Sequence, residues 1–288
     1  MRTIAHISDL HFGTEDPVVA ENLVTALGRD RPSLVVISGD LTQRARGAQF
    51  AAARDYLCRL PVPQVVVPGN HDVPLYDVTR RFLSPLGRYG RYISEVLNPV
   101  FEDEELFVAG LNTARSLTWK NGRISCEQID TLRGVLARAG ERFKIVVTHH
   151  PFIPPPVSEG EAAIDLVGRA VEALDVLDHF KVDLLLAGHL HHGYAGDTRT
   201  HYPAAKHSII AAQAGTAISR RRRHEPNAYN WITIADQHLS IEVRVWDGAQ
   251  FKPKQTTHYT LRGEEWMVVN PEAERTVAAP PAKTPPDA

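Results

Sequence analysis

Short runs of apolar and β-branched residues recur along the first two thirds of the chain, each bounded by Gly, Asp, Asn, Pro or His. They predict six buried strands, at residues 3–7, 34–38, 64–67, 106–111, 144–148 and 183–187. Apolar residues at helical spacing between most of these strands predict helices at 17–28, 45–60, 126–139 and 164–180. Asp16 before Pro17 is a predicted N-cap, and Ser125 with Gln128 is a predicted capping box. The alternation indicates an α/β fold with a mostly parallel sheet and helices on its faces.

The pattern changes after residue 206, where strand-like runs follow one another without helices between them. These runs predict strands at 207–213, 229–235, 239–246 and 256–261, which would form a second, mixed or antiparallel sheet. The stretch from Pro271 to Ala288 holds five prolines among Ala, Thr, Lys and Glu, a composition typical of disorder. We therefore expect one domain at 1–262 and a C-terminal extension at 263–288 that is disordered from about residue 271.

Composition and charge narrow the class of protein. The 288 residues are 43% hydrophobic and 23% charged, as in ordinary soluble globular proteins. The net charge of −2 does not provide the basic surface of a general nucleic-acid binder. The chain turns polar at Ser8 and Asp9 and has no run of 18 apolar residues. We therefore expect no signal peptide, no membrane span and a cytoplasmic location.

Histidine and aspartate follow the predicted strands. Fourteen His stand beside only two Cys, Cys58 and Cys126, so a metal site would use nitrogen and oxygen ligands rather than thiolates. The segments that follow strands are Asp9-x-His11, Gly39-Asp40, Gly69-Asn70-His71-Asp72, His149-His150 and Gly188-His189-x-His191. One such segment alone is typical of an ordinary turn. Ligands bind at the carboxyl ends of strands in open α/β sheets, so five segments together predict one site rich in metal-ligating groups.

The order of these segments resembles the calcineurin-like metallophosphoesterases over residues 3–192. The stretch Ala214-Gly215-Thr216, with Asn227 to Trp231, is similar to the branch that includes bacterial cyclic nucleotide phosphodiesterases. The resemblance implies a four-layer α/β/β/α sandwich of two mixed β-sheets flanked by helices. It also implies two metal ions, one held by Asp9, His11 and His191, the other by Asn70, His149 and His189, with Asp40 bridging both. These ligands suit Mn, Fe, Zn or Co.

The resemblance further implies the chemistry of the site. Two divalent ions outweigh the charges of Asp9, Asp40 and a metal-bridging hydroxide, the expected nucleophile, and so leave a cationic site for a phosphate ester. We expect His71 to stabilise the phosphoryl group or protonate the leaving oxygen, with Asp72 orienting it through a hydrogen bond. Candidate substrate contacts are Arg44, which could equally be a solvated residue at a helix start, and Asn112.

The expected function is hydrolysis of a small-molecule phosphodiester, and the resemblance favours a 3′,5′-cyclic nucleotide such as cAMP. The metal ligands do not separate this reaction from hydrolysis of another phosphate ester or pyrophosphate, such as a nucleotide-linked lipid precursor, a glycerophosphodiester or a phosphomonoester. A non-catalytic scaffold is disfavoured because every expected ligand is present. Two features stay open: residues 80–92 fit a lid or a surface helix, and Arg220 to Arg223 fit a solvated loop or a substrate-recognition loop.

Overall fold

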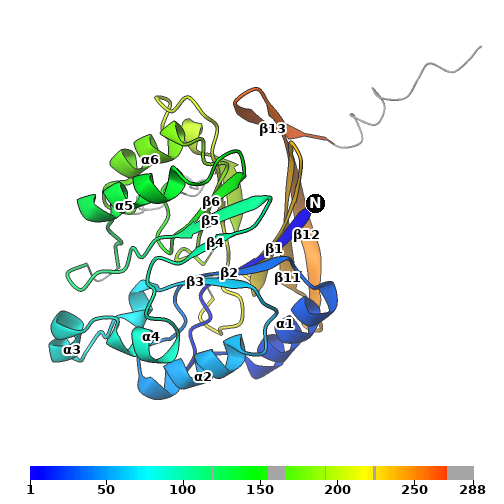
Figure 1. Cartoon of the computed structure of the whole chain (residues 1–288). Helices are drawn as coiled ribbons and strands as arrows, with labels where there is room; N and C mark the ends of the chain where they lie inside the picture. Colours follow the sequence, from blue (N-terminus) through cyan, green and yellow to red (C-terminus); the bar gives the residue numbers. More distant parts are fainter. Residues whose placement is uncertain (119, 155–165, 192, 223–224, 271–288) are drawn as a thin grey trace, which may run out of the picture.

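Two β-sheets lie against each other at the centre of the molecule, and helices cover the outer face of each sheet (Figure 1). The computed structural model describes residues 1–118, 120–154, 166–191, 193–222 and 225–270. The layers follow the order helix, sheet, sheet, helix. The α/β/β/α sandwich of two mixed sheets is thereby confirmed.

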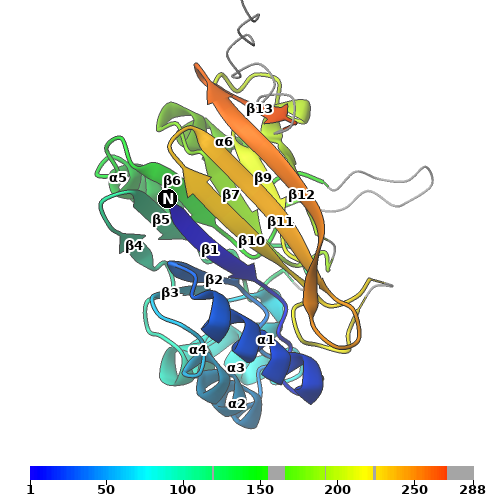
Figure 2. The ribbon, with the colours of Figure 1, turned by 90° about the vertical axis from the view of Figure 1, so that its right-hand side faces the viewer.

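The first sheet has seven strands, ordered β13, β12, β11, β10, β1, β2, β3 (Figure 2). Its parallel strands are β1 (Arg2–Ile7), β2 (Leu34–Ser38) and β3 (Gln64–Val67). Its antiparallel strands are β10 (Ala228–Ala235), β11 (His238–Trp246), β12 (Phe251–Arg262) and β13 (Glu265–Val269). Ile7 pairs with Ile37, which pairs with Val66, so the three parallel strands end at the same level.

The second sheet has six strands, ordered β4, β5, β6, β7, β9, β8. The four central strands are parallel: β5 (Leu106–Gly110), β6 (Phe143–Val147), β7 (Leu184–Ala187) and β9 (Ile210–Gln213). The antiparallel edges are β4 (Val100–Glu102) and β8 (Tyr194–Asp197). Val147 pairs with both Gly110 and Leu186, so the carboxyl ends of β5, β6 and β7 also lie level.

The helices pack on the sheets through their apolar faces. The first sheet is covered by α1 (Pro17–Asp30), α2 (Gly47–Leu57) and α4 (Gly87–Tyr92), with the short α3 (Val78–Leu83) beside them. The second sheet is covered by α5 (Cys126–Leu136) and α6 (Ala170–His179). Two 3-10 turns, η1 (Asn70–Asp72) and η2 (Thr198–Thr200), complete the elements of the described residues.

Two predicted helix starts are confirmed in atomic detail. Asp16 accepts a hydrogen bond from the backbone N–H of Val18 at 3.0 Å, as an N-cap does. At α5, Ser125 and Gln128 each accept the other's backbone N–H at 3.1 Å, which completes the capping box.

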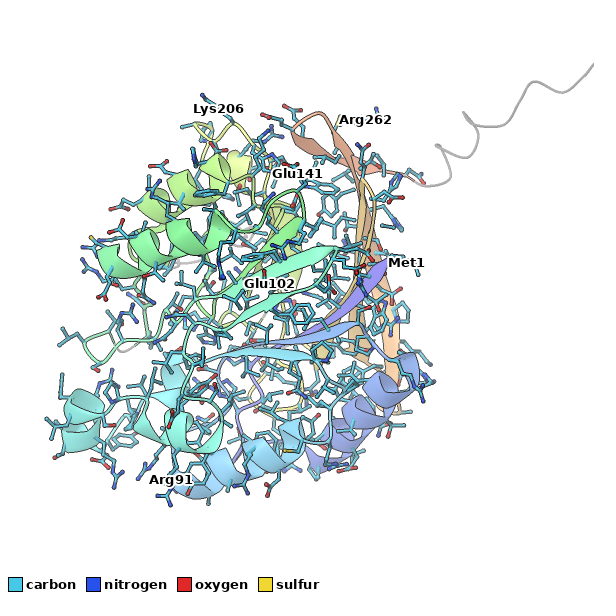
Figure 3. All side chains as sticks on the ribbon, viewed as in Figure 1. Met1, Arg91, Glu102, Glu141, Lys206 and Arg262 are labelled. Atoms are coloured by element: carbon cyan, nitrogen blue, oxygen red, sulfur yellow. The ribbon has the colours of Figure 1, made fainter. Side chains whose placement is uncertain are left out.

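Buried side chains form three clusters that correspond to the three interfaces between layers. One lies between the first sheet and its helices and includes Leu23, and one lies under α5 and α6 and includes Leu132. The third, which includes Val36, lies between the two sheets. Side chains fill the space between the ribbons (Figure 3). The sheets are therefore held rigidly, and with them the loops that leave their carboxyl ends.

The prediction that the early strands form one parallel sheet and the late strands a second sheet is wrong. The chain leaves the first sheet after β3, builds the second from β4 to β9, and returns with β10, which pairs antiparallel with β1. An apolar run such as residues 144–148 indicates a buried strand, because strands in parallel sheets are apolar on both faces. It does not report which of two buried sheets the strand joins.

Two expectations concern the ends of elements. β13 pairs with β12, so the first sheet continues past residue 262, the expected end of the domain. The expected disordered tail from 271, residues 164–165 at the expected start of a helix, and Arg223 lie outside the described residues. In the described part of the chain, no helix is both long and apolar enough to span a membrane.

Candidate metal centre and active site

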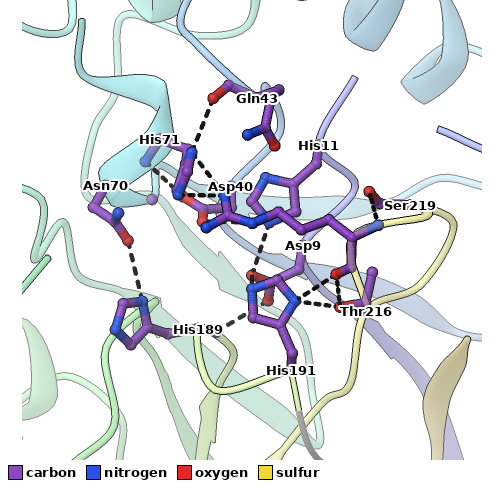
Figure 4. Close-up of polar contacts among 12 residues, drawn as sticks. Asp9, His11, Asp40, Gln43, Asn70, His71, His189, His191, Thr216 and Ser219 are labelled. Carbon is purple, nitrogen blue, oxygen red and sulfur yellow. Dashed lines mark hydrogen bonds and ion pairs between the residues drawn. The ribbon is translucent and has the colours of Figure 1, made fainter. Parts of the chain in front are cut away.

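The polar segments that follow five strands meet at one place between the two sheets, and Figure 4 labels residues from the segments after β1, β2, β3 and β7. Three leave the first sheet after β1, β2 and β3, and two leave the second after β6 and β7. The side chains they bring together are those expected to hold metal: Asp9, His11, Asp40, Asn70, His149, His189 and His191. Their convergence follows from the level carboxyl ends of the parallel strands in each sheet.

Five of these residues have left-handed backbone conformations, which L-amino acids rarely adopt. Their φ angles lie between 47° and 73°. The residues are Asp9, His11, Asp40, His189 and His191. Such conformations cost free energy and persist where the surrounding structure enforces them, most often at functional sites. Here they turn each side chain into the space between the sheets as soon as its strand ends.

Two glycines allow the loops to approach one another closely. A Cβ atom on Gly188 would overlap Ser8 Oγ, and one on Gly69 would overlap Asp40 Oδ1. Neither glycine has a positive φ, so the requirement is for space rather than for backbone freedom. Glycine at these two positions lets loops from different strands bring their ligating atoms together.

The first group of ligating atoms lies on buried residues. Asp9 Oδ1 lies 3.4 Å from His11 Nε2 and 3.5 Å from His191 Nε2. Asp9 Oδ1 and both ring nitrogens of His11 are buried without a hydrogen-bond partner among the described residues. Buried polar atoms are otherwise nearly always paired. A cation bound by Asp9 Oδ1 and His11 Nε2 would satisfy both of these atoms, so the residues present fit a metal ion.

The second group adjoins the first through Asp40. Asn70 Oδ1 lies 3.1 Å from both His149 Nε2 and His189 Nδ1. Asp40 Oδ1 lies 3.4 Å from His149 Nε2, and Asp40 Oδ2 lies 3.7 Å from His11 Nε2. One carboxylate therefore faces both groups with different oxygens, as a bridging ligand would.

Hydrogen bonds behind the ligating atoms fix their orientation. His149 Nδ1 donates to the backbone oxygen of Ser38 at 2.7 Å, which leaves Nε2 facing Asp40. His191 Nδ1 lies 2.5 Å from Thr216 Oγ1, which leaves its Nε2 facing Asp9. Asp9 Oδ2 accepts from Ser8 Oγ at 2.6 Å, so only Oδ1 stays open. Such partners set the tautomer and direction of metal ligands.

The ionisation of the site in the protein without metal follows from burial and mutual charge. Burial alone would raise the pKa of Asp40, but the neighbouring His149 and His71 outweigh it and hold that pKa well below its usual range. Burial opposes the charge of His149 too, yet Asp40 raises the pKa of His149 to about 9. Burial and the charge of His149 lower the pKa of His189 to about 3. The site thus holds an ionised Asp40 and a protonated His149, and a metal ion would displace the proton of His149.

A cavity of about 300 Å³ opens onto these groups. His71 lies in it, and its Nδ1 donates to the backbone oxygen of Gln43 at 2.9 Å. Three cationic side chains line the same cavity: Arg44, Lys120 and Arg221. The described residues that line it include one carboxylate, Asp40. The cavity therefore presents cations to whatever lies over the metal-ligating atoms.

Residues 2–193 match the family model described as calcineurin-like phosphoesterase. The chain belongs to the calcineurin-like phosphoesterase family. The predicted resemblance is confirmed, and the chain is a metal-dependent phosphoesterase. Metal-binding chemistry is a property of the family, and the geometry shows which residues of this chain could supply it.

Relatives of this phosphoesterase carry several substrate names. It is 28% identical over 206 residues to a probable cyclic nucleotide phosphodiesterase of Synechococcus sp., covering 67% of this chain and 74% of the relative. It is 26% identical to the glycerophosphodiester phosphodiesterase GpdQ of Enterobacter lignolyticus, covering 72% and 78%. It is 25% identical to the 3′,5′-cyclic adenosine monophosphate phosphodiesterase CpdA of Pseudomonas aeruginosa, covering 81% and 85%.

Solved structures share the fold of the phosphoesterase at lower identity. The structure of PhoD superposes with a TM-score of 0.67 at 13% identity, covering 93% of this chain and 71% of PhoD. Purple acid phosphatase PPD1 from yellow lupin superposes with a TM-score of 0.60 at 14% identity, covering 88% and 53%. These similarities support the four-layer architecture.

The expected role of Asp72 is wrong in one respect, because its carboxylate does not reach the ring of His71. Asp72 is buried, and its oxygens accept hydrogen bonds from Gly69 N, Leu41 N, Thr42 N and Thr42 Oγ1 at 2.9–3.1 Å. It therefore ties the loop after β2, which carries Asp40, to the loop after β3, which carries Asn70. The Gln43 carbonyl, rather than Asp72, orients His71.

Replacing Asp72 with Asn is expected to lower the free energy of unfolding by about 2–4 kcal/mol, because the new amide group would face N–H donors and leave them unsatisfied. Urea denaturation of the two proteins measures the difference. Asp77→Asn is the matched control, since Asp77 makes only exposed contacts, a hydrogen bond from Arg80 N and an ion pair with Arg80 Nε, and its change should cost at most about 1 kcal/mol. Equal stability of both variants would contradict the structural role of Asp72.

Asn112 also lies away from the metal-ligating groups. Its Oδ1 accepts from the backbone N–H of Ala114 at 2.9 Å, and its own N–H donates to Asn98. It lines a separate cavity between α4 and residues 112–116, so the expected crevice contact is wrong. Arg44 does line the cavity at the site. Lys120 was not predicted there, and Arg221 belongs to the run at 220–223, for which a substrate-recognition loop was one of two interpretations.

Proposed function

We propose that this phosphoesterase hydrolyses a phosphodiester at a centre of two metal ions. One ion would be held by Asp9, His11 and His191, the other by Asn70, His149 and His189, with Asp40 bridging both. The observation that carries the proposal is the placement of Asp40, whose two oxygens face two separate groups of ligating atoms. Oxygen and nitrogen ligands without thiolate suit Mn, Fe, Zn or Co, and both Cys58 and Cys126 are exposed and unpaired.

When bound, the two ions supply an activated water and stabilise the charge of the reacting phosphoryl group. The remaining work falls to side chains of this chain. His71 lies in the cavity with Nδ1 donating to Gln43, which points Nε2 toward the space above the metal-ligating atoms. From there the ring, protonated at Nε2 as the anionic substrate binds, would hydrogen-bond the leaving oxygen and give it that proton as the ester bond breaks, keeping its other proton on Nδ1. Arg44 would contact a phosphoryl oxygen.

Two substrate classes are supported by relatives. The names of two of them favour a cyclic nucleotide, and the name of a third favours a glycerophosphodiester. A cavity of about 300 Å³ is at the small end of ligand pockets, which suits a compact phosphodiester over a polymer. We propose a 3′,5′-cyclic nucleotide such as cAMP as the substrate and a glycerophosphodiester as the second candidate.

A panel assay tests the proposal. Protein stripped of metal and reloaded with Mn²⁺ or Fe is given cAMP, a glycerophosphodiester, bis(p-nitrophenyl) phosphate and an aryl phosphomonoester. We expect cAMP to be turned over fastest relative to its uncatalysed rate. The glycerophosphodiester and the aryl diester are the comparisons. Exclusive hydrolysis of the phosphomonoester would contradict the proposed reaction.

Metal binding by this centre is expected to depend on pH. Asp40 raises the pKa of His149 to about 9, so His149 carries a proton at pH 7 that the metal ion must displace from Nε2. Affinity at that position should therefore rise about tenfold per pH unit between pH 7 and 8 and level off above pH 9. Calorimetry in two buffers of different ionisation enthalpy measures the protons released. A metal affinity that changes by less than about tenfold between about pH 6.5 and pH 8.5 would contradict the protonation of His149.

A further inference from the structure

The loop at residues 214–222 lies at the mouth of the site, beyond the part of the chain that matches the family model. Asn227 Nδ2 donates to the backbone oxygens of Ser219 and Thr216 at 2.8 and 3.2 Å. Ser219 Oγ also lies 2.9 Å from Thr14 Oγ1, in the segment that follows His11. The loop is therefore fixed at several points against the metal-ligating segments.

Arg221, within this loop, contacts two residues of the site with different atoms. Its backbone oxygen lies 3.1 Å from His191 Nδ1, behind the ligating face of that ring. Its Nη1 lies 2.7 Å from His71 Nε2. Because His71 Nδ1 donates to Gln43, its Nε2 is the acceptor and the guanidinium is the donor. The guanidinium thus covers the nitrogen that faces the cavity.

Arg44 reaches the same imidazole from a different loop. Its Nη1 lies 3.4 Å from His71 Nδ1, and Arg221 Nη1 lies 3.3 Å from that atom. The contact with His71 does not neutralise either charge, because an imidazole ring carries no negative charge. Two cations that converge on one imidazole in one cavity form a receptor for an anion with several oxygens.

We propose that Arg221 is a further catalytic residue, which together with Arg44 binds the non-bridging oxygens of the phosphoryl group under attack. The inference deepens the proposed function, because it names the side chains that would hold the substrate's charged oxygen atoms. A guanidinium presents two N–H groups in one plane, which match two phosphoryl oxygens. The same side chain leaves His71 Nε2 when the anion binds, and so frees that nitrogen to take up the proton that it then gives to the leaving oxygen.

Arg221→Ala tests the proposal, with Arg220→Ala and Arg222→Ala as matched controls. Both neighbours are exposed, and Arg220 faces Asp16 at 3.5 Å, away from the cavity lining. The Ala variant keeps the backbone oxygen that contacts His191, so its metal content should equal that of the unaltered protein. Three measurements are made on Mn²⁺-loaded protein: metal content, the dissociation constant of inorganic phosphate by calorimetry, and turnover of bis(p-nitrophenyl) phosphate.

We expect Arg221→Ala to weaken phosphate binding by about tenfold or more and to lower kcat/KM by about 100-fold, as loss of one donor to a reacting oxyanion does. Arg221→Lys should recover part of both losses, since it restores the charge but not the planar pair of donors. The controls should stay within about twofold of the unaltered protein.

The outcomes separate this proposal from the proposed function. If the Arg221→Ala variant matches the two control variants in phosphate binding and turnover, the proposed role of Arg221 is wrong. Loss of metal from Arg221→Ala would overturn it too, because the side chain would then support the metal centre. If the unaltered protein hydrolyses no phosphodiester yet binds phosphate through Arg221, the anion receptor stands and the phosphodiesterase proposal fails.

Discussion

Asp40→Asn is expected to lower the rate of phosphodiester hydrolysis by more than about 1000-fold. This loss is larger than the loss of about 10- to 100-fold that is typical when a residue hydrogen-bonded to a metal ligand is replaced. The physical reason is the position of the carboxylate, which faces His149 with one oxygen and His11 with the other. An amide has one oxygen and no charge, so it cannot hold two cations. Metal content measured on the same preparation should fall below two ions per chain.

The control for this prediction is a second buried carboxylate far from the site. Asp183 precedes β7, at the opposite end of that strand from His189, and accepts the backbone N–H of Lys144 at 2.9 Å. Asp183→Asn should keep its metal and its turnover even where stability falls. If Asp40→Asn retained activity and two bound ions, the bridging assignment would be wrong.

His71→Gln is expected to lower turnover of cAMP by about 100- to 1000-fold while leaving metal content unchanged. The Gln side chain is able to donate to the Gln43 backbone oxygen, as His71 Nδ1 does, but it has no proton to transfer. The loss should be smaller with bis(p-nitrophenyl) phosphate, because nitrophenolate leaves without being protonated.

This difference between substrates distinguishes proton transfer from positioning. A residue that only supports the loop would lower turnover of both substrates by the same factor. Equal losses of turnover with the two substrates, or full activity of the His71→Gln variant toward cAMP, would contradict the proposed role of His71. Loss of metal in this variant would instead place His71 among the groups that support the centre.

The metal-ligating segments were predictable from the sequence because their position depends on a local rule. Each lies directly after a buried apolar run, and the carboxyl ends of parallel strands lie level within a sheet. Asp9 and His149 follow strands of different sheets, and the structure brings them together although the single sheet expected for those strands was wrong. Their roles as ligands remain proposals that rest on this geometry and on the family.

Other features depend on contacts between distant segments, which periodicity does not report. Membership of β6 in the second sheet and the return of β10 to β1 are set by packing of whole layers. The hydrogen bonds of Asp72 with the loop after β2 join residues about thirty positions apart. Neighbouring positions in a sequence motif, such as His71 and Asp72, need not contact each other through their side chains.

The arginine run shows the same limit at the surface. Four consecutive arginines are typical of a solvated loop, and composition alone does not mark one of them. In the structure Arg220 faces Asp16, whereas Arg221 reaches His71 from a loop fixed by Asn227. The assignment of one residue within the run depends on that fixed loop, which brings residue 221 beside residue 71.

Titration of metal-free protein with Mn²⁺ tests the central claim most directly, with bound metal and hydrolysis of bis(p-nitrophenyl) phosphate measured in the same samples. Two groups of ligating atoms joined by Asp40 predict saturation at two ions per chain, with turnover appearing as the second ion binds. Full turnover without metal, or saturation at one ion with full turnover, would contradict a centre of two metal ions.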